Sequence, residues 1–260
     1  LGAKQALALE PLDLRDVPSE AAPLVHQINE LFTRIRHSTD MERRFTADAA
    51  HELRKPVAAV RAQAEVARGT GDATVRSKAL DQVIHACDRM GVLMEQLLTL
   101  ARLEQAPSTQ LQTPLDLALI VRNAIAELAP AALQNGIDIS LESSGNTTVT
   151  GRAALLDMLI RNLLSNAIQH GRSDVQVRIK ALPGGVTLTV SDAGPGVAPA
   201  DITQLGDRFF RGGATGPGSG LGLSIVRRVA DLHQAALSFR NDDTGRGFVA
   251  SATFPAGDRS

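Results

Sequence analysis

Apolar residues early in the chain recur at steps of three and four, which is the spacing of one face of a helix. The stripe predicted for a first helix, with a phase shift over residues 38–41, consists of Leu24, Ile28, Leu31, Ile35, Phe45, Ala49, Leu53, Val60 and Ala64. GTGD at residues 69–72 interrupts this pattern. The stripe of the next helix consists of Leu80, Val83, Cys87, Met90, Met94, Leu97 and Ala101. The sequence predicts a long helical hairpin, and because one hairpin buries such stripes poorly, we expect two copies to form a four-helix bundle.

A different pattern begins after QAPSTQLQTP, a stretch with the composition of a linker, which we expect to connect two domains over residues 107–114. Helices are predicted from about residue 116, at 152–170 and at 220–232, and strands at 137–141, 175–181, 186–191, 235–240 and 247–254. Mixed strands and amphipathic helices indicate an α/β two-layer sandwich with its helices on one face of a sheet.

Composition narrows the class of protein. The chain has 260 residues, 43% of them hydrophobic, and a formal net charge of -1, so it can bury a core and lacks the basic surplus of nucleic-acid binders. Its single cysteine, Cys87, excludes an internal disulfide, agrees with a reducing cytoplasm and is expected in the core. No apolar run approaches the ~20 residues of a membrane span. Because the chain starts at Leu1 rather than Met, we expect it to be part of a longer protein.

The motif HELRKP, residues 51–56, places a histidine beside a glutamate within the first predicted helix. At ~100° per residue, His51 falls almost opposite the apolar stripe and is expected to be exposed. A histidine with a pKa near ~6.5 keeps an unprotonated nitrogen at neutral pH and can act as a nucleophile, while Glu52 can hold its other nitrogen. Pro56 removes a hydrogen bond to the carbonyl of Glu52, so we expect a kink there. Alone, the motif fits a solvated helix face equally well.

Two asparagines, Asn162 and Asn166, lie four residues apart in NLLSN and share one face of a predicted helix. Their amide oxygens could help bind Mg²⁺, which usually keeps several waters and is shared with phosphate oxygens. Without the glycine-rich turns that follow in the sequence, two polar residues on a wet helix face would be the simpler interpretation.

Glycine-rich stretches follow a predicted strand and precede a predicted helix. DAGPG, residues 192–196, is a turn whose glycines allow the backbone close to a ligand, and Asp192 can accept a hydrogen bond from an amine such as that of adenine. GPGSGLGLSIV, residues 216–226, opens a helix whose first N–H groups suit phosphate, with neither a Rossmann nor a Walker spacing. Between the two turns, a loop with Arg208 and Arg211 could close over a triphosphate.

In order and spacing, these motifs resemble those of the sensor histidine kinases of bacterial two-component systems. HELRKP resembles the phosphoacceptor box, NLLSNAIQHG the N box, DAGPG the first glycine box, RFFRG the phenylalanine box and GSGLGL the second glycine box, while TGRG at residues 244–247 is similar to a weak third. The resemblance covers nearly the whole chain. It implies a membrane-proximal signalling segment at 1–37, a dimerisation and histidine phosphotransfer hairpin at 38–106, the linker at 107–114 and a Bergerat-type ATP-binding domain at 115–260.

The resemblance also implies an activity and its residues. His51 would attack the γ-phosphate of ATP, with Glu52 assisting its deprotonation, and the phosphoryl group would pass to an aspartate of a response regulator. Asn166, helped by Asn162, would bind Mg²⁺. The residues implied to bind the nucleotide are Asn162, Asn166, His170, Asp192, Gly194, Gly196, Arg208, Arg211, Gly218, Gly220, Leu221 and Gly222.

Partners follow from the same resemblance. They are a second copy of the chain, bound through the hairpin, and the receiver domain of a response regulator, with no nucleic acid. A membrane would be reached only through a region outside this sequence. The chain would then be the cytoplasmic portion of an inner-membrane sensor protein.

Two features depart from the family's pattern. Gln169 is neutral where relatives often carry a basic residue near phosphate, so we expect Arg208 or Arg211 to take that task, and His170 stands where an aromatic residue often stacks near the nucleotide. Lys55 stands where many relatives have Thr or Asn, which helps position the water that dephosphorylates the regulator. Because lysine only donates hydrogen bonds, we expect weak phosphatase activity with kinase activity retained.

Two other classes of protein share features with this sequence. ATP-hydrolysing clamp proteins share the nucleotide fold, but they carry a glutamate general base where Asn162 stands, and an amide cannot take the proton of water. A pseudokinase scaffold would bind partners without transferring phosphate, which intact His51, Asn166 and Asp192 argue against. The remaining histidines lack comparable context and are expected to be ordinary polar residues: His26, His37, His85 and His233.

Overall fold

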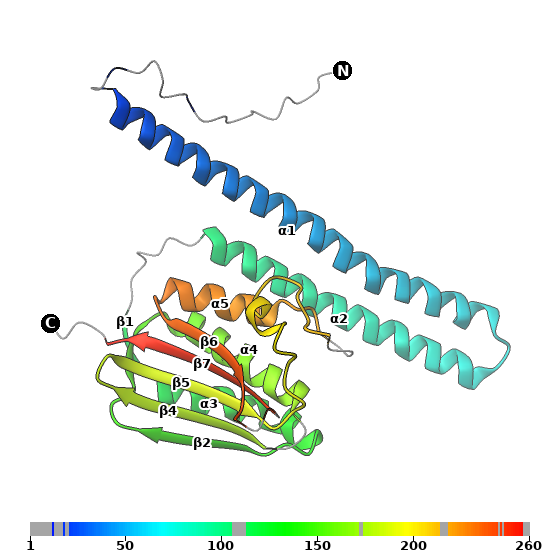
Figure 1. The fold of residues 1–260 in the computed structure, drawn as a ribbon. Coiled ribbons are helices and arrows are strands. Elements are labelled where there is room, and N and C mark those ends of the chain that lie inside the picture. Colours follow the sequence, from blue (N-terminus) through cyan, green and yellow to red (C-terminus); the bar gives the residue numbers. More distant parts are fainter. Residues whose placement is uncertain are drawn as a thin grey trace. The chain divides into compact units, whose positions relative to one another are not determined.

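The structure, a computed structural model, has a helical hairpin followed by an α/β domain (Figure 1). It describes residues 12, 18, 21–105, 113–171, 174–213, 218–243, 245 and 247–256, without the side chains of residues 37, 38, 41, 42, 44, 45, 104 and 105. The elements are α1 (Ala22–Gly69), α2 (Ala73–Gln105), β1 (Thr113–Asp116), α3 (Leu117–Gln134), β2 (Ile139–Ser144), β3 (Thr148–Gly151), α4 (Ala153–His170), β4 (Val175–Leu182), β5 (Gly185–Asp192), η1 (Ile202–Gln204), α5 (Gly222–Leu232), β6 (Ala236–Asn241) and β7 (Phe248–Pro255).

Several predictions concern residues that lie outside this description. Most of the membrane-proximal segment before residue 21 and most of the linker at 107–114 belong to them. So do the side chains of Ser38 and Met41, which bound the predicted phase shift. The limits predicted for the four domains therefore stay predictions.

The turn between α1 and α2 is closed by local hydrogen bonds. The N–H of Thr70 donates to the carbonyl of Val66 at 3.1 Å and so completes the last turn of α1. Asp72 caps α2, because its carboxylate accepts from the N–H groups of Thr74 and Val75 at 2.7 and 3.3 Å. The predicted interruption is thus a short turn between two helices whose free backbone groups find partners.

The helix α1 continues through Pro56 over its full 48 residues. The proline has no N–H to donate to the carbonyl of Glu52. The helix is therefore continuous where a kink is expected just after His51, and the kink itself stays a prediction.

Much of the predicted apolar stripe of the hairpin is exposed in the single chain. In α1, Leu24 and Leu31 are 60% and 53% exposed, and in α2, Leu80 and Met94 are 49% and 50% exposed. Cys87 is exposed as well, so the expectation that it is a core residue is wrong for the isolated chain. A single stripe on each helix is wider than one neighbouring helix can cover.

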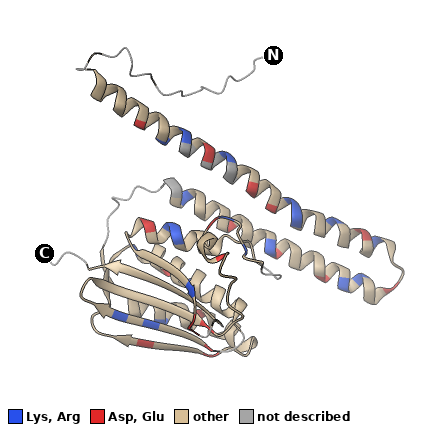
Figure 2. Ribbon diagram, in the orientation of Figure 1, with Lys and Arg blue, Asp and Glu red and all other residues tan. Residues whose placement is uncertain are grey.

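Charged residues of both signs are interspersed along the hairpin helices (Figure 2). Arg34 lies 4.0 Å from Glu30, and Arg61 donates to Glu65 at 3.1 Å. All four side chains are mostly exposed, so each pair contributes at most a few tenths of a kcal/mol, about the value of exposed helix pairs. These faces are ordinary solvated helix surface.

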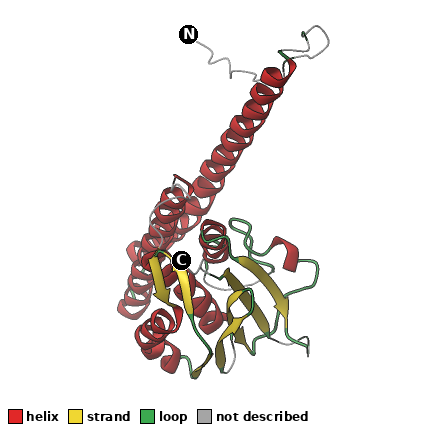
Figure 3. Ribbon diagram, turned by 90° about the vertical axis from the view of Figure 1, so that its left-hand side faces the viewer, coloured by secondary structure: helices red, strands yellow, loops and turns green. Residues whose placement is uncertain are grey.

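The α/β domain is built on a five-stranded sheet with the order β2-β4-β5-β7-β6. The strands β2 and β4 are parallel, and the other neighbours are antiparallel. The helices α3, α4 and α5 cover one face of this sheet, with α4 packed against both of the others (Figures 1 and 3). This confirms the predicted α/β two-layer sandwich after a helical hairpin.

Alternation along the central strands separates an apolar face from a polar one. The buried apolar side chains of β4, β5 and β7 include Val175, Val177, Ile179, Leu188, Val190, Ala250, Ala252 and Phe254. Between them in sequence, hydroxyl groups pair across strands, Thr187 with Thr253 at 3.0 Å and Thr189 with Ser251 at 3.1 Å. The helices therefore cover a core, and the opposite face satisfies its own hydroxyls.

Two short strands were missing from the predicted pattern. The strands β1 and β3 form a separate antiparallel ribbon, in which Leu115 lies opposite Val149. Thr113 and Pro114, which the sequence placed in the linker, belong to β1. Four residues are too few to display an alternating pattern, and the pairing joins segments that are distant in sequence.

One described helix, α3, is long and apolar enough by length and composition to cross a membrane. Its apolar side chains Leu117, Val121 and Ala124 are instead fully buried, and α3 packs against α4 and β2. It is a core helix of the domain.

His233 is buried, so the expectation that it is an ordinary polar residue is wrong. Its Nδ1 lies 2.8 Å from the carbonyl of Val229, and its Nε2 accepts from the N–H of Arg152 at 3.2 Å. Nδ1 must therefore carry the proton that Val229 accepts. Burial lowers the pKa of His233, the charge of Arg152 acts in the same direction, and the bond to Val229 opposes both.

This histidine predicts a pH dependence of stability. Below about pH 6.5 the unfolded chain takes up a proton more readily than the buried ring. The free energy of unfolding should therefore fall as the pH drops below that value towards the lowered pKa of the folded state. The substitution His233→Leu should lower stability at pH 7.5 by roughly 1–3 kcal/mol, because the N–H of Arg152 loses its acceptor, and should flatten the acid slope.

Urea unfolding between pH 5 and 8 measures both effects. His85→Leu, at an exposed position of α2, is the matched control and should keep the slope of the parent. An unchanged acid slope in the His233 variant would contradict the assignment.

Candidate functional site

One cavity of the α/β domain collects most of the residues that the sequence singled out. Its volume is about 510 Å³, which is typical of a site for a small molecule. The residues that line it are Gln96, Asn162, Asn166, Gln169, His170, Asp192, Pro195, Gly196, Val197, Leu205, Phe210, Arg211, Gly212, Gly213, Gly218, Ser219, Gly220, Gly222, Leu223 and Phe248. They come mainly from α4, the turn after β5, the loop before α5 and the start of α5.

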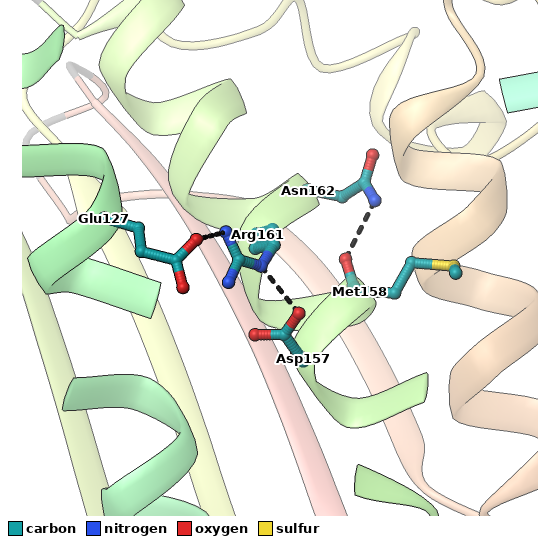
Figure 4. Close-up of polar contacts among 5 residues, drawn as sticks. All are labelled: Glu127, Asp157, Met158, Arg161 and Asn162. Atoms are coloured by element: carbon teal, nitrogen blue, oxygen red, sulfur yellow. Dashed lines mark hydrogen bonds and ion pairs between the residues drawn. The ribbon is translucent and has the colours of Figure 1, made fainter. Parts of the chain in front are cut away.

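The helix α4 contributes Asn162 and Asn166 to the lining. The amide nitrogen of Asn162 donates to the carbonyl of Met158 at 2.8 Å, so the amide oxygen points away from that bond (Figure 4). A Cβ atom at Gly222 would lie 3.1 Å from this oxygen, closer than side chains usually approach. Glycine at the start of α5 therefore leaves room for an acceptor on α4.

Arg161 connects α4 to α3 next to these asparagines. Its guanidinium donates to Asp157 of the same helix and to Glu127 of α3, both at 2.6 Å (Figure 4). Hydrogen bonds to Glu127 first and then to Asp157 raise the pKa of Arg161, so it is fully charged at any physiological pH. These charge-assisted bonds hold the helix that presents Asn162.

Asp192 ends β5 and is only 8% exposed. Its carboxylate accepts from the N–H of Gly194 at 2.8 Å and from the N–H of Phe248. Burial raises the pKa of Asp192, while the two backbone donors and the nearby His170 oppose that rise. A carboxylate buried beside a cavity is a strong acceptor for a ligand that offers an N–H group.

The end of α4 crosses directly over the turn that follows Asp192. A Cβ atom at Gly194 would lie 2.5 Å from the carbonyl oxygen of His170, so only glycine permits this approach. Burial lowers the pKa of His170, and the charge of Arg211 adds to this effect while that of Asp192 opposes it. The N-box helix and the first glycine turn therefore form one packed unit.

The second glycine stretch is packed against the loop that precedes it. The N–H of Phe209 donates to the carbonyl of Gly220 at 3.0 Å, and Phe209 itself has a positive φ of 61°. Ser219 accepts from the N–H of Leu221 at 3.1 Å and donates to the side chain of Gln96 on α2 at 2.6 Å. The phenylalanine box and the start of α5 are thus joined by backbone contacts.

The structure brings together most of the residues expected to bind the nucleotide. Those that line the cavity are Asn162, Asn166, His170, Asp192, Gly196, Arg211, Gly218, Gly220 and Gly222. Gly194 and Leu221 lie behind the lining, since the N–H of Gly194 donates to Asp192 and Leu221 is fully buried. Arg208 is not among the lining residues described. Thr244 and Arg246 of the weak third glycine box lie outside the described residues.

Several lining residues were missed by sequence reasoning. They are Gln96, Pro195, Val197, Leu205, Phe210, Gly212, Gly213, Ser219, Leu223 and Phe248. Those that lie inside the quoted motifs and could have been included are Pro195, Phe210, Gly212, Ser219 and Leu223. Phe248 lies opposite Asp192 in the pairing of β5 with β7, a register that no local pattern displays.

The predicted phosphoacceptor, His51, is exposed on α1, as the helical wheel predicts. Glu52 lies next to it, but its carboxylate accepts from the ammonium of Lys55 at 2.5 Å rather than holding the imidazole. The Glu52 side chain is 21% exposed and that of Lys55 60%. The glutamate is thus engaged by the lysine in this conformation.

The cavity offers neutral amide oxygens that could hold a magnesium ion together with the ligand's own phosphates. Within the described residues, there is no group of three or more His, Cys, Asp or Glu side chains that could hold a metal. The oxygen of Asn162 and the side chain of Asn166 beside the cavity are suitable ligands. Such a set fits Mg²⁺, which accepts oxygen ligands, keeps waters and binds together with phosphates.

Comparison with known proteins gives two matched domains. Residues 151–258 match the histidine kinase-, DNA gyrase B- and HSP90-like ATPase family, and residues 41–106 match the His Kinase A (phospho-acceptor) domain. The sensor protein QseC of Salmonella typhi is 45% identical over 245 residues, which cover 92% of this chain and 54% of QseC. The sensor protein BasS of Salmonella typhimurium is 34% identical over 245 residues, covering 93% of this chain and 67% of BasS. The chain belongs to the sensor histidine kinase family.

The fold of this sensor histidine kinase chain has a solved counterpart. A crystal structure of the histidine kinase ThkA in complex with the response regulator protein TrrA matches with a TM-score of 0.71 and 18% identity, over 93% of this chain and 68% of that one. The likeness is one of fold. The chain spans about half the length of the QseC proteins that it matches.

The buried carboxylate predicts opposite effects on stability and binding. Because burial penalises the charged form of Asp192, the substitution Asp192→Asn should raise the melting temperature of the nucleotide-free protein at pH 7.5. It should weaken ATP binding at least about tenfold, because an amide nitrogen would face a donor of the ligand and a charge-assisted hydrogen bond would be lost.

Calorimetry and thermal melting test this pair of outcomes. Asp231→Asn, at an exposed position of α5, is the matched control and should change neither quantity. ATP binding of parental strength in the Asp192 variant would remove Asp192 from the binding site.

Proposed function

We propose that this chain is the catalytic part of a protein-histidine kinase that binds ATP in the cavity of the α/β domain, phosphorylates His51 and passes the phosphoryl group to an aspartate of a response regulator. The observation that carries this proposal is the convergence of Asn162, Asn166 and Asp192 on one cavity. The exposed His51 on the hairpin supplies a matching acceptor.

In this function the cavity holds ATP by three kinds of contact. The carboxylate of Asp192 accepts from the exocyclic amine of adenine, since it is buried and already anchored by the N–H of Gly194. The backbone of Gly218 and Gly220 and the guanidinium of Arg211 lie on the lining where phosphates would be placed. Gln169 is also on the lining, but it is neutral and adds no charge.

Asn166 and Asn162 would hold Mg²⁺ together with the phosphates of ATP. When bound, the ion neutralises negative charge that accumulates on the phosphate oxygens. The asparagines contribute oxygen ligands without adding charge, so the site has little affinity for the ion in the absence of nucleotide. This explains why the ion and the nucleotide would bind together.

The transfer itself needs a neutral imidazole at His51. One ring nitrogen forms a bond to the γ-phosphorus while the bond from phosphorus to the oxygen of ADP breaks, and the other ring nitrogen then loses its proton. Glu52 would accept or orient that proton. In the present conformation the carboxylate of Glu52 forms an ion pair with Lys55. This ion pair must break, so that the carboxylate can contact the imidazole, before Glu52 can assist.

The proposal extends to partners and location. The exposed apolar side chains of α1 and α2, such as Leu31 and Met94, would be covered by a second copy of the chain in a four-helix bundle. A receiver domain would dock near His51, as the ThkA structure pairs a kinase with a regulator. The chain would be the cytoplasmic portion of an inner-membrane sensor.

The clamp-type ATPase, which the ATPase family match also includes, is a weaker candidate. Water attack on ATP needs a general base, and Asn162, whose nitrogen donates to Met158, cannot remove a proton. The matched phosphoacceptor domain over residues 41–106 also has no role in such an enzyme.

Incubation with γ-labelled ATP and Mg²⁺ tests the kinase. The parent should acquire label that is stable to alkali and labile to acid, as expected of a phosphohistidine, and His51→Ala should acquire none while binding ATP with the parental affinity. His85→Ala, at an exposed position of α2, is the matched control and should be labelled like the parent. Equal labelling of the His51 variant would disprove the assignment.

Lys55 generates a separate prediction about dephosphorylation. The substitution Lys55→Thr introduces a hydroxyl that can accept from and donate to water. It should increase dephosphorylation of the phosphorylated regulator by roughly tenfold, because a hydroxyl that only positions water contributes less than the ~100-fold or more of a proton-transfer group. Arg54→Thr, one position away and also exposed, is the control. If the Lys55→Thr protein dephosphorylates the regulator no faster than the parent, Lys55 is not the cause of weak phosphatase activity.

A further inference from the structure

A side chain outside the recognised motifs holds the first glycine turn. Asn241, the last residue of β6, accepts from the N–H of Val197 through Oδ1 at 2.8 Å and donates through Nδ2 to the carbonyl of Val197 at 2.7 Å. The side-chain oxygen and nitrogen of Asn241 are therefore both hydrogen-bonded to the backbone of Val197. These two hydrogen bonds fix the orientation of the Asn241 amide as well as its distance from Val197, because the amide cannot rotate about one of them without breaking the other.

The residue held in this way belongs to the nucleotide cavity. Val197 lines the cavity together with Pro195 and Gly196, and these residues follow Asp192 in the turn. A Cβ atom at Gly196 would lie 2.9 Å from Oδ1 of Asn241, so the amide is packed against the backbone of the turn. The side chain of Asn241 thus acts directly on the wall beside the proposed adenine site.

A second contact from the same hairpin holds the other end of the turn. The N–H of Gly247 donates to the carbonyl of Gly194 at 2.7 Å. Asn241 pairs with Phe248 in the β6–β7 ladder, and Phe248 also lines the cavity. The end of β6 and the residue before β7 therefore hold the turn, at Val197 through the Asn241 side chain and at Gly194 through the N–H of Gly247.

We propose that Asn241 is a positioning residue for nucleotide binding, which keeps the segment from Asp192 to Val197 in its ligand-ready conformation. The proposal rests on the proposed function, in which this cavity binds ATP. Because the turn carries glycines at 194 and 196, it has unusual backbone freedom when released. A released turn must be ordered again when ATP binds, and that entropic cost weakens affinity.

The role differs from a general contribution to stability. Asn241 lies at the end of β6, which is an edge strand of the sheet, and is half-buried, so its loss should perturb the fold little. ATP affinity should fall, whereas the rate at saturating ATP should change little, since the bound turn regains the same geometry. The expected signature is a higher KM for ATP at nearly constant kcat.

The experiment compares Asn241→Ala and Asn241→Asp with the parent. The alanine removes both hydrogen bonds, and the aspartate keeps an acceptor for the N–H of Val197 but sets a carboxylate oxygen against its carbonyl. Both variants should bind ATP about five- to tenfold more weakly, the loss expected for one or two hydrogen bonds. Amide hydrogen exchange at Val197 in the nucleotide-free protein should accelerate in Asn241→Ala.

A matched control separates positioning from stability. Asn135→Ala removes a side-chain amide that donates to the carbonyl of Ala131 at 2.8 Å, at the end of α3 and away from the cavity lining. It should lower the melting temperature slightly while leaving ATP affinity unchanged, because its one exposed hydrogen bond lies far from the cavity lining.

The outcomes distinguish the two proposals. If the parent binds ATP and both Asn241 variants bind it equally well, the positioning role is wrong and the kinase proposal stands. If the ATP affinity of the Asn241 variants falls only because a lowered melting temperature leaves part of the protein unfolded at the assay temperature, the role is merely structural and the proposal fails. If the parent itself binds no ATP, the proposed function fails and this inference fails with it.

Discussion

The burial of one carboxylate organises the α/β domain. Removing the Asp192 carboxylate from water costs free energy unless donors replace the lost solvent, and two of its neighbours in the fold, the backbone N–H groups of Gly194 and Phe248, do so. This requirement draws the turn after β5 and the start of β7 together. The end of α4 then closes over the same turn at His170, where a glycine leaves space for its carbonyl. Asp192 is therefore both the candidate acceptor for a ligand and the point at which α4, the turn after β5 and the start of β7 meet.

Much of this arrangement could be predicted from the sequence. Periodicity located both hairpin helices, and GTGD at residues 69–72, which interrupts it, located the turn between them. The five strands of the main sheet were found because alternation extends over six to eight residues in each. The motifs located most of the cavity lining, because glycines and asparagines at fixed spacing have few other uses.

The remainder depends on contacts between distant segments. The ribbon of β1 and β3 is too short to show a period, and Phe248 reaches the cavity only through the register of β7 against β5. His233 was misjudged because its surroundings come from α4's first turn and from Phe254 on β7, with ring centroids 6.3 Å apart. Cys87 was expected to be buried and is exposed. Periodicity identifies the apolar face of a helix, but it does not show whether a single chain covers that face.

The continuity of α1 also has a mechanical meaning. At ~1.5 Å per residue, its 48 residues form a rod of about 72 Å, and between Ala22 and His51 it is one unbroken helix. In the proposed kinase, a displacement at the beginning of this rod would reach His51 through continuous helix. The carbonyl of Glu52, one residue after His51, lacks its helical hydrogen bond because Pro56 has no N–H to donate. In the proposed kinase, α1 would therefore bend most easily next to the residue that accepts the phosphoryl group.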